Sequence, residues 1–157
     1  MIKEESGKQL LYKEGSDGME ARDWLEHMQD GQQKRLLLEM NAATIEYGLV
    51  LSKEEIEMLL QERKNELKRQ QRVEFGEGIL PKLIMEFCNS AYIYADNYAE
   101  TIVRLQAIFY TFKNELGDEI PDTEILQFMY AQYEQFCGGD LDYLESACLE
   151  NWEWRQE

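Results

Sequence analysis

The sequence has few of the residues from which most catalytic and metal sites are built. Only one histidine and three cysteines occur among 157 residues. His27 has Trp24 where the Glu-x-x-His motif of carboxylate-bridged metal bundles places a glutamate, so that motif is absent. Gly76 and Gly78 lack the third glycine of a phosphate loop, and their acidic neighbours would repel phosphate. The sequence therefore predicts no metal, no cofactor and no identifiable catalytic residue.

Long hydrophobic runs and an excess of basic residues are also missing. The longest purely apolar runs are short, as at residues 36–38, whereas a helix needs about 20 apolar residues to cross a bilayer. Asp and Glu number 32 against 16 Lys and Arg, which gives a net charge of −16. Such a charge disfavours direct contact with nucleic-acid phosphates or anionic lipids. We therefore expect neither nucleic acid nor a membrane as a direct partner.

The three cysteines, Cys88, Cys137 and Cys148, form no Cys-x-x-Cys pair. An odd number of cysteines at wide spacing is typical of reduced thiols, and the N-terminus has no apolar stretch of the kind found in secretory signals. We therefore expect a cytoplasmic protein. Each cysteine also occupies an apolar helical pattern, which favours the role of a small buried hydrophobic residue.

What the chain does contain is a recurring pattern of helix starts and helix ends. Polar side chains that can cap a helix precede apolar runs of helical spacing, and glycines follow those runs. The starts are Ser52, Asn97, Asp122 and Asp140, and the ends are Gly48, Gly117 and Gly138-Gly139. The pattern predicts an all-α fold, an irregular bundle of six or seven helices in a single domain. Residues 1–16 are expected to be a mobile or weakly docked tail, and residues 17–157 the helical domain.

Local motifs refine this prediction at several helices. Gly31 predicts a break between a short helix over about 18–30 and a second over about 32–47. Ser52 and Asn97 each have a glutamate three residues later, which is the spacing of a capping box. The heptad spacing after Asn97 predicts a central helix that ends near Gly117. The next helix is expected to bury one apolar face that includes Phe136.

Several segments resemble a known family, namely Tyr47–Ser52, Arg72–Gly76, Leu83–Cys88, Asn97–Thr101 and Phe109–Glu115. The chain is similar, from about residue 35 to about residue 155, to a family of small acidic bacterial proteins of unknown function. That family is seen mainly in anaerobic Gram-positive bacteria. The resemblance implies a cytosolic bacterial protein, and it implies no activity, ligand or catalytic residue.

Three functional hypotheses follow from the sequence. The first is a non-enzymatic helical module that acts by protein–protein contact, as an adaptor or regulator. Its candidate surface consists of Arg72, Glu74, Asn97, Glu100, Lys113 and Asn114. The second is an acidic mimic that blocks a nucleic-acid-binding protein, and the third is an enzyme that uses carboxylates or Cys88. Two aromatic segments, Cys88–Tyr94 and Trp152–Trp154, are also possible anchors for a partner, although closing the edge of the core is the favoured interpretation.

Overall fold

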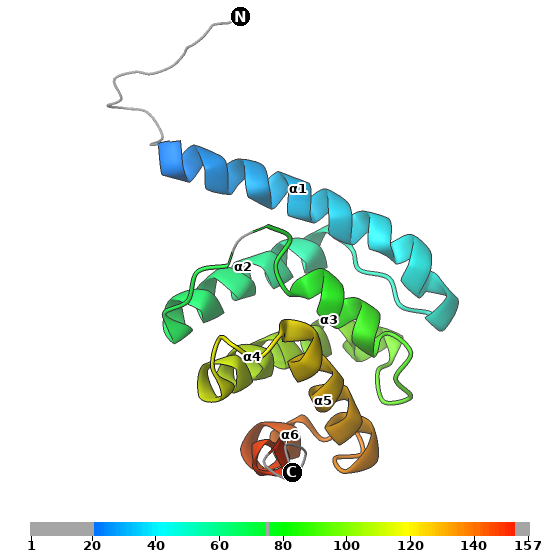
Figure 1. Cartoon of the computed structure of the whole chain (residues 1–157). Helices are drawn as coiled ribbons and strands as arrows, with labels where there is room; N and C mark the ends of the chain where they lie inside the picture. Colours follow the sequence, from blue (N-terminus) through cyan, green and yellow to red (C-terminus); the bar gives the residue numbers. More distant parts are fainter. Residues whose placement is uncertain (1–20, 75, 153–157) are drawn as a thin grey trace, which may run out of the picture. The chain divides into compact units, whose positions relative to one another are not determined.

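The computed structural model describes residues 21–74 and 76–152 (Figure 1). These residues form six α-helices and three short 3-10 helices, and no strand is found among them. In chain order the elements are α1 (Ala21–Thr44), η1 (Ile45–Tyr47), α2 (Lys53–Gln70), α3 (Leu80–Phe87), η2 (Ala95–Asn97), α4 (Tyr98–Leu116), α5 (Asp122–Gln135), α6 (Leu141–Ala147) and η3 (Cys148–Glu150). The prediction of an all-α irregular bundle is confirmed. The predicted tail, residues 1–16, lies outside the described part of the chain.

The chain divides into two units, residues 1–33 and 34–157, and α1 runs from the first into the second. The predicted break at Gly31 is wrong, because α1 continues through it to Thr44. A glycine inside a helix lowers stability by only about 0.5–1 kcal/mol relative to alanine. Gly31 is not among the glycines with positive φ, whereas Gly48 is, at φ 78°. The left-handed residue that ends this segment is therefore Gly48, as predicted.

The start of α2 is the capping box that the sequence predicts. Glu55 N donates to Ser52 Oγ at 3.0 Å, and Ser52 N donates to Glu55 Oε1 at 2.9 Å. At its other end Gln71 adopts a left-handed conformation, with φ 58°. This conformation is uncommon for a residue other than glycine, and no residue pattern predicted it.

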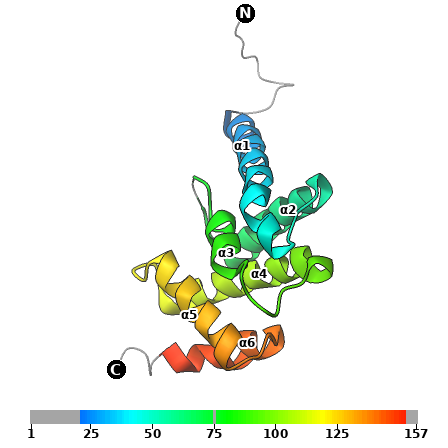
Figure 2. The same ribbon diagram turned by 90° about the vertical axis from the view of Figure 1, so that its right-hand side faces the viewer.

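Helix α4 is central to the second unit, as predicted. It packs against α2, α3, α5 and α6. Figure 2 shows α2 and α3 on one side of it and α5 and α6 on the other. The heptad positions of α4 are all buried: Tyr98, Ile102, Leu105, Phe109 and Phe112. Ile108 and Tyr110 are buried as well, so the buried surface of α4 is wider than its heptad seam, as expected for a helix that contacts four others.

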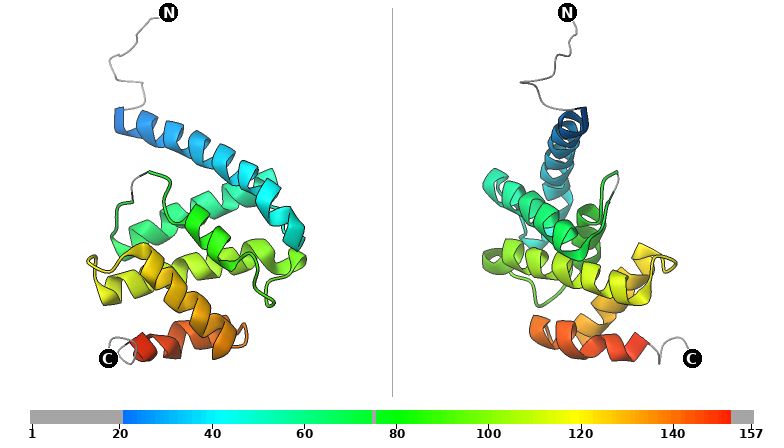
Figure 3. Two further views of the ribbon diagram at one scale, coloured as in Figure 1. Left: turned by 45° about the vertical axis from the view of Figure 1, so that its right-hand side comes forward. Right: turned by 90° about the vertical axis from the view of Figure 1, so that its left-hand side faces the viewer.

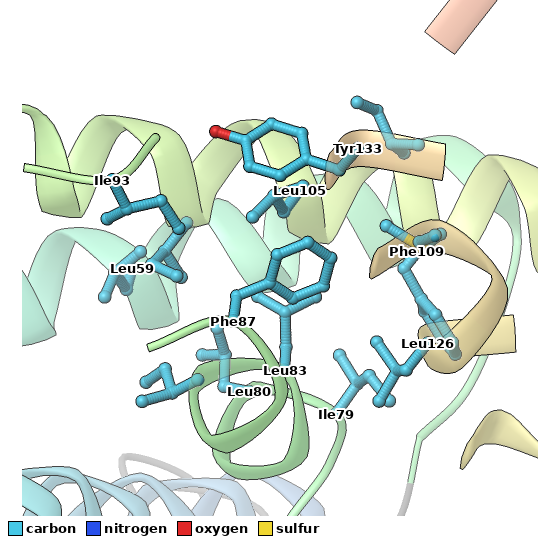
Figure 4. Close-up of a cluster of buried hydrophobic side chains, with 14 of the residues drawn as sticks. Leu59, Ile79, Leu80, Leu83, Phe87, Ile93, Leu105, Phe109, Leu126 and Tyr133 are labelled. Carbon is cyan, nitrogen blue, oxygen red and sulfur yellow. The ribbon is translucent and has the colours of Figure 1, made fainter. Parts of the chain in front are cut away.

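The core is filled by large apolar side chains that the four surrounding helices direct at α4. Figure 4 shows Phe87 of α3 beneath the ring of Tyr133 of α5, with Leu105 of α4 close by. The Phe87 and Tyr133 rings meet edge to face, with centroids 5.6 Å apart. Such pairs contribute about 0.5–1.5 kcal/mol beyond their buried area. Among the described helices, none combines the length and the apolar character that crossing a membrane requires.

One residue expected in this core lies outside it. Phe136 follows the last residue of α5 and 62% of its surface is exposed. The helical pattern no longer applies there, because the chain leaves α5 after Gln135. Cys137, the next residue, packs against the core instead.

Candidate protein-interaction surface

Four of the six candidate surface residues lie near the C-terminal ends of α2 and α4. Arg72 Nη1 donates to Asn114 Oδ1 at 2.6 Å, and its Nη2 pairs with the Asp118 carboxylate. Asn114 Nδ2 donates in turn to Gln70 Oε1 at 2.7 Å. The hydrogen bond and charge of Arg72 lower the pKa of the Asp118 carboxyl. These contacts join the two helix ends.

Lys113 belongs to the same end of α4 but is buried. Its Nζ donates to the carbonyl oxygen of Ile120 at 2.6 Å and lies 2.9 Å from Asp122 Oδ1. Asp122 is the first residue of α5. Through this hydrogen bond and ion pair, Lys113 links the end of α4 to the start of α5.

Glu74 lies in a buried cluster that holds the turn between α2 and α3. Its Oε1 accepts hydrogen bonds from Arg63 Nε at 2.6 Å and from Tyr110 Oη at 2.7 Å. Gly78 packs directly against this cluster, and a Cβ at position 78 would lie only 2.7 Å from Glu74 Oε1, so a larger residue would clash there. Burial and the adjacent carboxylate raise the pKa of Tyr110, so its phenol stays a hydrogen-bond donor.

The remaining two candidates, Asn97 and Glu100, lie at the opposite end of α4. Positions 97 and 114 are 17 residues apart in the sequence, which corresponds to about 25 Å of helix. The predicted capping box at Asn97 is wrong, because its side chain makes no cap hydrogen bond to α4. Asn97 ends η2 and its Oδ1 accepts from Tyr94 N at 2.8 Å. The six candidates thus occupy two separate places.

A second surface lies where the loop after α3 meets the connection between α5 and α6 (Figure 3). Tyr92 of this loop meets Tyr133 edge to face, with centroids 6.0 Å apart. It also lies so close to Gly139 that a Cβ there would be 2.7 Å from two Tyr92 carbons. Ser90 Oγ donates to the Glu134 carboxylate. The loop is therefore tied to the end of α5 by packing and by a charge-assisted hydrogen bond.

We use the name aromatic corner for this contact together with the exposed aromatic residues near it in the chain, and define it as Tyr92, Tyr94, Tyr133 and Phe136. Tyr92 and Tyr133 are its packed base, while Tyr94 and Phe136 expose 58% and 62% of their surfaces. Sequence reasoning singled out the loop but assigned Phe136 to the core. The signal that pointed outward was the position of Phe136, immediately before the Cys-Gly-Gly turn that ends α5.

Trp152, the described residue of the C-terminal aromatic segment, closes the edge of the core, in line with the favoured interpretation. Trp152 is buried and meets Phe128 edge to face at 5.1 Å between centroids. Trp154 lies outside the described residues.

Cys88 has the environment of a structural thiol. Only 6% of its surface is exposed, and its Sγ lies 3.7 Å from the carbonyl oxygen of Met85. Burial raises the pKa of the Cys88 thiol, whereas nucleophilic cysteines have lowered pKa values. Across residues 28–74 and 76–152, no cluster of three or more histidine, cysteine or acidic side chains is placed to bind a metal.

The fold and these surfaces define an all-α protein whose polar candidate residues are largely engaged in contacts within the chain. A family model of unknown function, DUF6323, matches residues 36–155. The chain therefore belongs to this family. No curated protein and no solved structure matches the chain.

Proposed function

We propose that this protein is a non-enzymatic helical module that binds another protein, as an adaptor or regulator. The binding surface in this proposal is the aromatic corner. The observation that carries it is the contrast between exposure and order at that corner. Tyr94 and Phe136 present more than half of their surfaces to solvent, yet they flank segments held by Tyr92 and Tyr133.

This arrangement suits the anchors of a protein interface. Aromatic side chains dominate the binding energy of many interfaces, since they bury a large area and have few rotatable bonds. A backbone that is already ordered loses little entropy on binding, so more of the contact energy becomes affinity. A partner with an apolar pocket would therefore be bound most tightly at Tyr94 and Phe136.

The net charge of −16 suggests which residues would surround the apolar pocket of the partner. A partner with basic residues around its pocket would be steered toward this chain, and added salt would slow its association. Arg72 and Asn114 have partners within the chain, so in this proposal they stabilise the fold rather than contact the partner. The family resemblance and the three free cysteine thiols support a bacterial cytoplasmic setting for the interaction.

The proposal is tested with purified full-length protein immobilised and exposed to a bacterial lysate, with bound proteins identified by mass spectrometry. We expect a specific partner that the Tyr94→Ala, Phe136→Ala double variant no longer retains. The matched control is Val73→Ala with Met58→Ala, since these side chains are also apolar and exposed but belong to the α2 side. The control is expected to retain the partner.

Other outcomes separate the hypotheses. If the corner variant keeps the partner while Arg72→Ala with Asn114→Ala loses it, the polar surface is the binding site and the aromatic corner is not. If the partner is a nucleic-acid-binding protein that nucleic acid displaces, the acidic-mimic hypothesis replaces the adaptor hypothesis. Recovery of no specific partner would contradict both.

A further inference from the structure

Two cysteines that are 11 residues apart in the sequence meet where the end of α5 lies against the end of α6. The Sγ atoms of Cys137 and Cys148 are 3.2 Å apart. Cys137 directly follows the residue that caps α5, and Cys148 is the first residue of η3. A disulfide needs the two sulfurs at about 2.05 Å, so an approach of about 1.1 Å would close the bond.

The backbone on both sides holds this pair in place. Cys137 N donates to the carbonyl oxygen of Gln132 at 2.9 Å, and Gly139 N donates to that of Tyr133 at 3.1 Å. Asp140 then caps α6 by accepting from two backbone N–H groups, so the chain returns toward the end of α5. The proximity of the two sulfurs therefore follows from an ordered turn.

We propose that Cys137 and Cys148 are a redox modification site, a dithiol that hydrogen peroxide converts to an intramolecular disulfide. This inference does not depend on the proposed binding function. Cys137 is the entry point because it is only partly buried, whereas 0% of the Cys148 surface is exposed. Peroxide can therefore reach Cys137 first, and Cys148 is the resolving thiol.

The reaction balances with peroxide as the oxidant. The Cys137 thiolate attacks one peroxide oxygen, the O–O bond breaks, and the other oxygen leaves as hydroxide, which takes a proton and becomes water. The Cys148 sulfur then attacks the sulfenic sulfur of Cys137. The hydroxide displaced in this step takes the Cys148 proton and leaves as a second water. The pair loses two electrons, which reduce the peroxide.

The surroundings of the pair predict how fast this reaction runs. Burial and the neighbouring Cys148 raise the pKa of Cys137 to about 12, and burial raises the pKa of Cys148. Since the thiolate is the reacting form, oxidation is slow near neutral pH and accelerates by about tenfold for each added pH unit. This is the behaviour of a pair that stays reduced until oxidant accumulates.

The test uses full-length protein that is reduced, freed of reductant and treated with hydrogen peroxide. We expect an intact mass lower by two hydrogens and a Cys137–Cys148 cross-linked peptide in a non-reducing digest. Cys88→Ser is the matched control, and it should oxidise in the same way because the close sulfur contact is between Cys137 and Cys148, while the Cys88 Sγ contacts the Met85 carbonyl oxygen. Cys137→Ser should abolish the cross-link. Closing this short loop should raise Tm by roughly 5–10 °C, reversibly with reductant.

Three results would overturn the inference. One is recovery of Cys137 as sulfinic acid without a cross-link in the wild-type protein. Another is a cross-link that involves Cys88. A third is a disulfide that forms at the same rate across about pH 7–9, which would exclude the Cys137 thiolate as the attacking group. Each is read from the wild-type chain or from Cys88→Ser, so a poorly folded Cys137→Ser variant cannot obscure the answer.

Discussion

The cluster of Arg63, Glu74 and Tyr110 gives the sharpest prediction about stability. The side chains of Arg63 and Glu74 are only 9% and 15% exposed, and one carboxylate oxygen accepts from both neighbours. Removing one partner of a buried ion pair typically costs about 3–5 kcal/mol, because the other charge keeps its desolvation penalty. Because water has slight access to Glu74, the desolvation penalty is smaller here, and Glu74→Ala should lower the free energy of unfolding by about 2–4 kcal/mol.

The tyrosine allows the same cluster to be tested by a double-mutant cycle. Tyr110→Phe removes one hydrogen bond to a charged group, which is worth about 1.5–3 kcal/mol. In a Glu74→Ala background the phenol has already lost this acceptor, so the same change should have little effect. The expected coupling energy is therefore about 1.5–3 kcal/mol, which is large beside the total stability of about 5–15 kcal/mol that is typical of proteins.

Urea unfolding followed by far-UV circular dichroism measures these free energies, provided that the m-value is unchanged. The control is Glu57→Ala, which breaks the ion pair with Lys34, whose side chains are 54% and 43% exposed. Exposed pairs contribute about 0–1 kcal/mol, so this variant should be near wild type. If Glu74→Ala is no worse than Glu57→Ala, or if the two changes at 74 and 110 are additive, the cluster does not hold the turn.

Three further predictions follow. Gly139→Ala should lower the free energy of unfolding by about 2–4 kcal/mol, because its φ is +85° and the added Cβ would overlap the Tyr92 side chain. Gly138→Ala, with φ +57° and no atom within 4 Å of the added Cβ, should lower it by only about 1 kcal/mol. Urea unfolding measures both. Burial raises the pKa of Tyr98 and Tyr133 to about 12, above the value of about 10 in the unfolded chain. The stability that the two phenols add is therefore complete below about pH 10 and is lost between about pH 10 and 12. The urea midpoint should fall across this range, and it should fall less steeply in Tyr133→Phe. Gly31→Ala should raise the free energy of unfolding by about 0.5–1 kcal/mol and increase the helix content measured by circular dichroism. A decrease in helix content would indicate that the helix breaks at residue 31.

Much of the fold was predictable because local signals agreed with one another. At Ser52 the cap residue, the glutamate three residues later and the apolar residues on either side all indicated the same helix start, and the capping box is present. At Asp140 the cap was also predicted, and its side chain accepts from the backbone of Asp142 and Tyr143. Signals within one turn of helix are sufficient for such predictions.

Other predictions failed where the surrounding chain, rather than the residue type, decided the local structure. Asn97 has the residue type and spacing of a cap, but the preceding 3-10 turn places its amide on Tyr94 N. Gly31 has the residue type of a helix end, but its neighbours continue the helix on both sides. Asn97 can cap a helix and Gly31 can end one, but in both cases the structure of the surrounding chain favoured another conformation.

The candidate site was harder to predict because its contacts are distant in the sequence. Arg72 and Asn114 are 42 residues apart, and only the packing of α2 on α4 brings them together. The cysteine pair was within reach of the sequence, since Cys137 and Cys148 flank a Gly-Gly turn between two helices.

The polar and aromatic candidates differ in what already occupies them. Arg72 hydrogen-bonds within the chain, and Lys113 is buried against a carbonyl and a carboxylate, so binding a partner through either would first break contacts that stabilise helix ends. Tyr94 and Phe136 gain contacts on binding without giving up burial, because most of their surface is exposed beforehand. Burial of apolar surface contributes about 25 cal/mol per Å². In the proposed function, the aromatic corner would therefore bind a partner at less cost to the fold than Arg72 or Lys113 would.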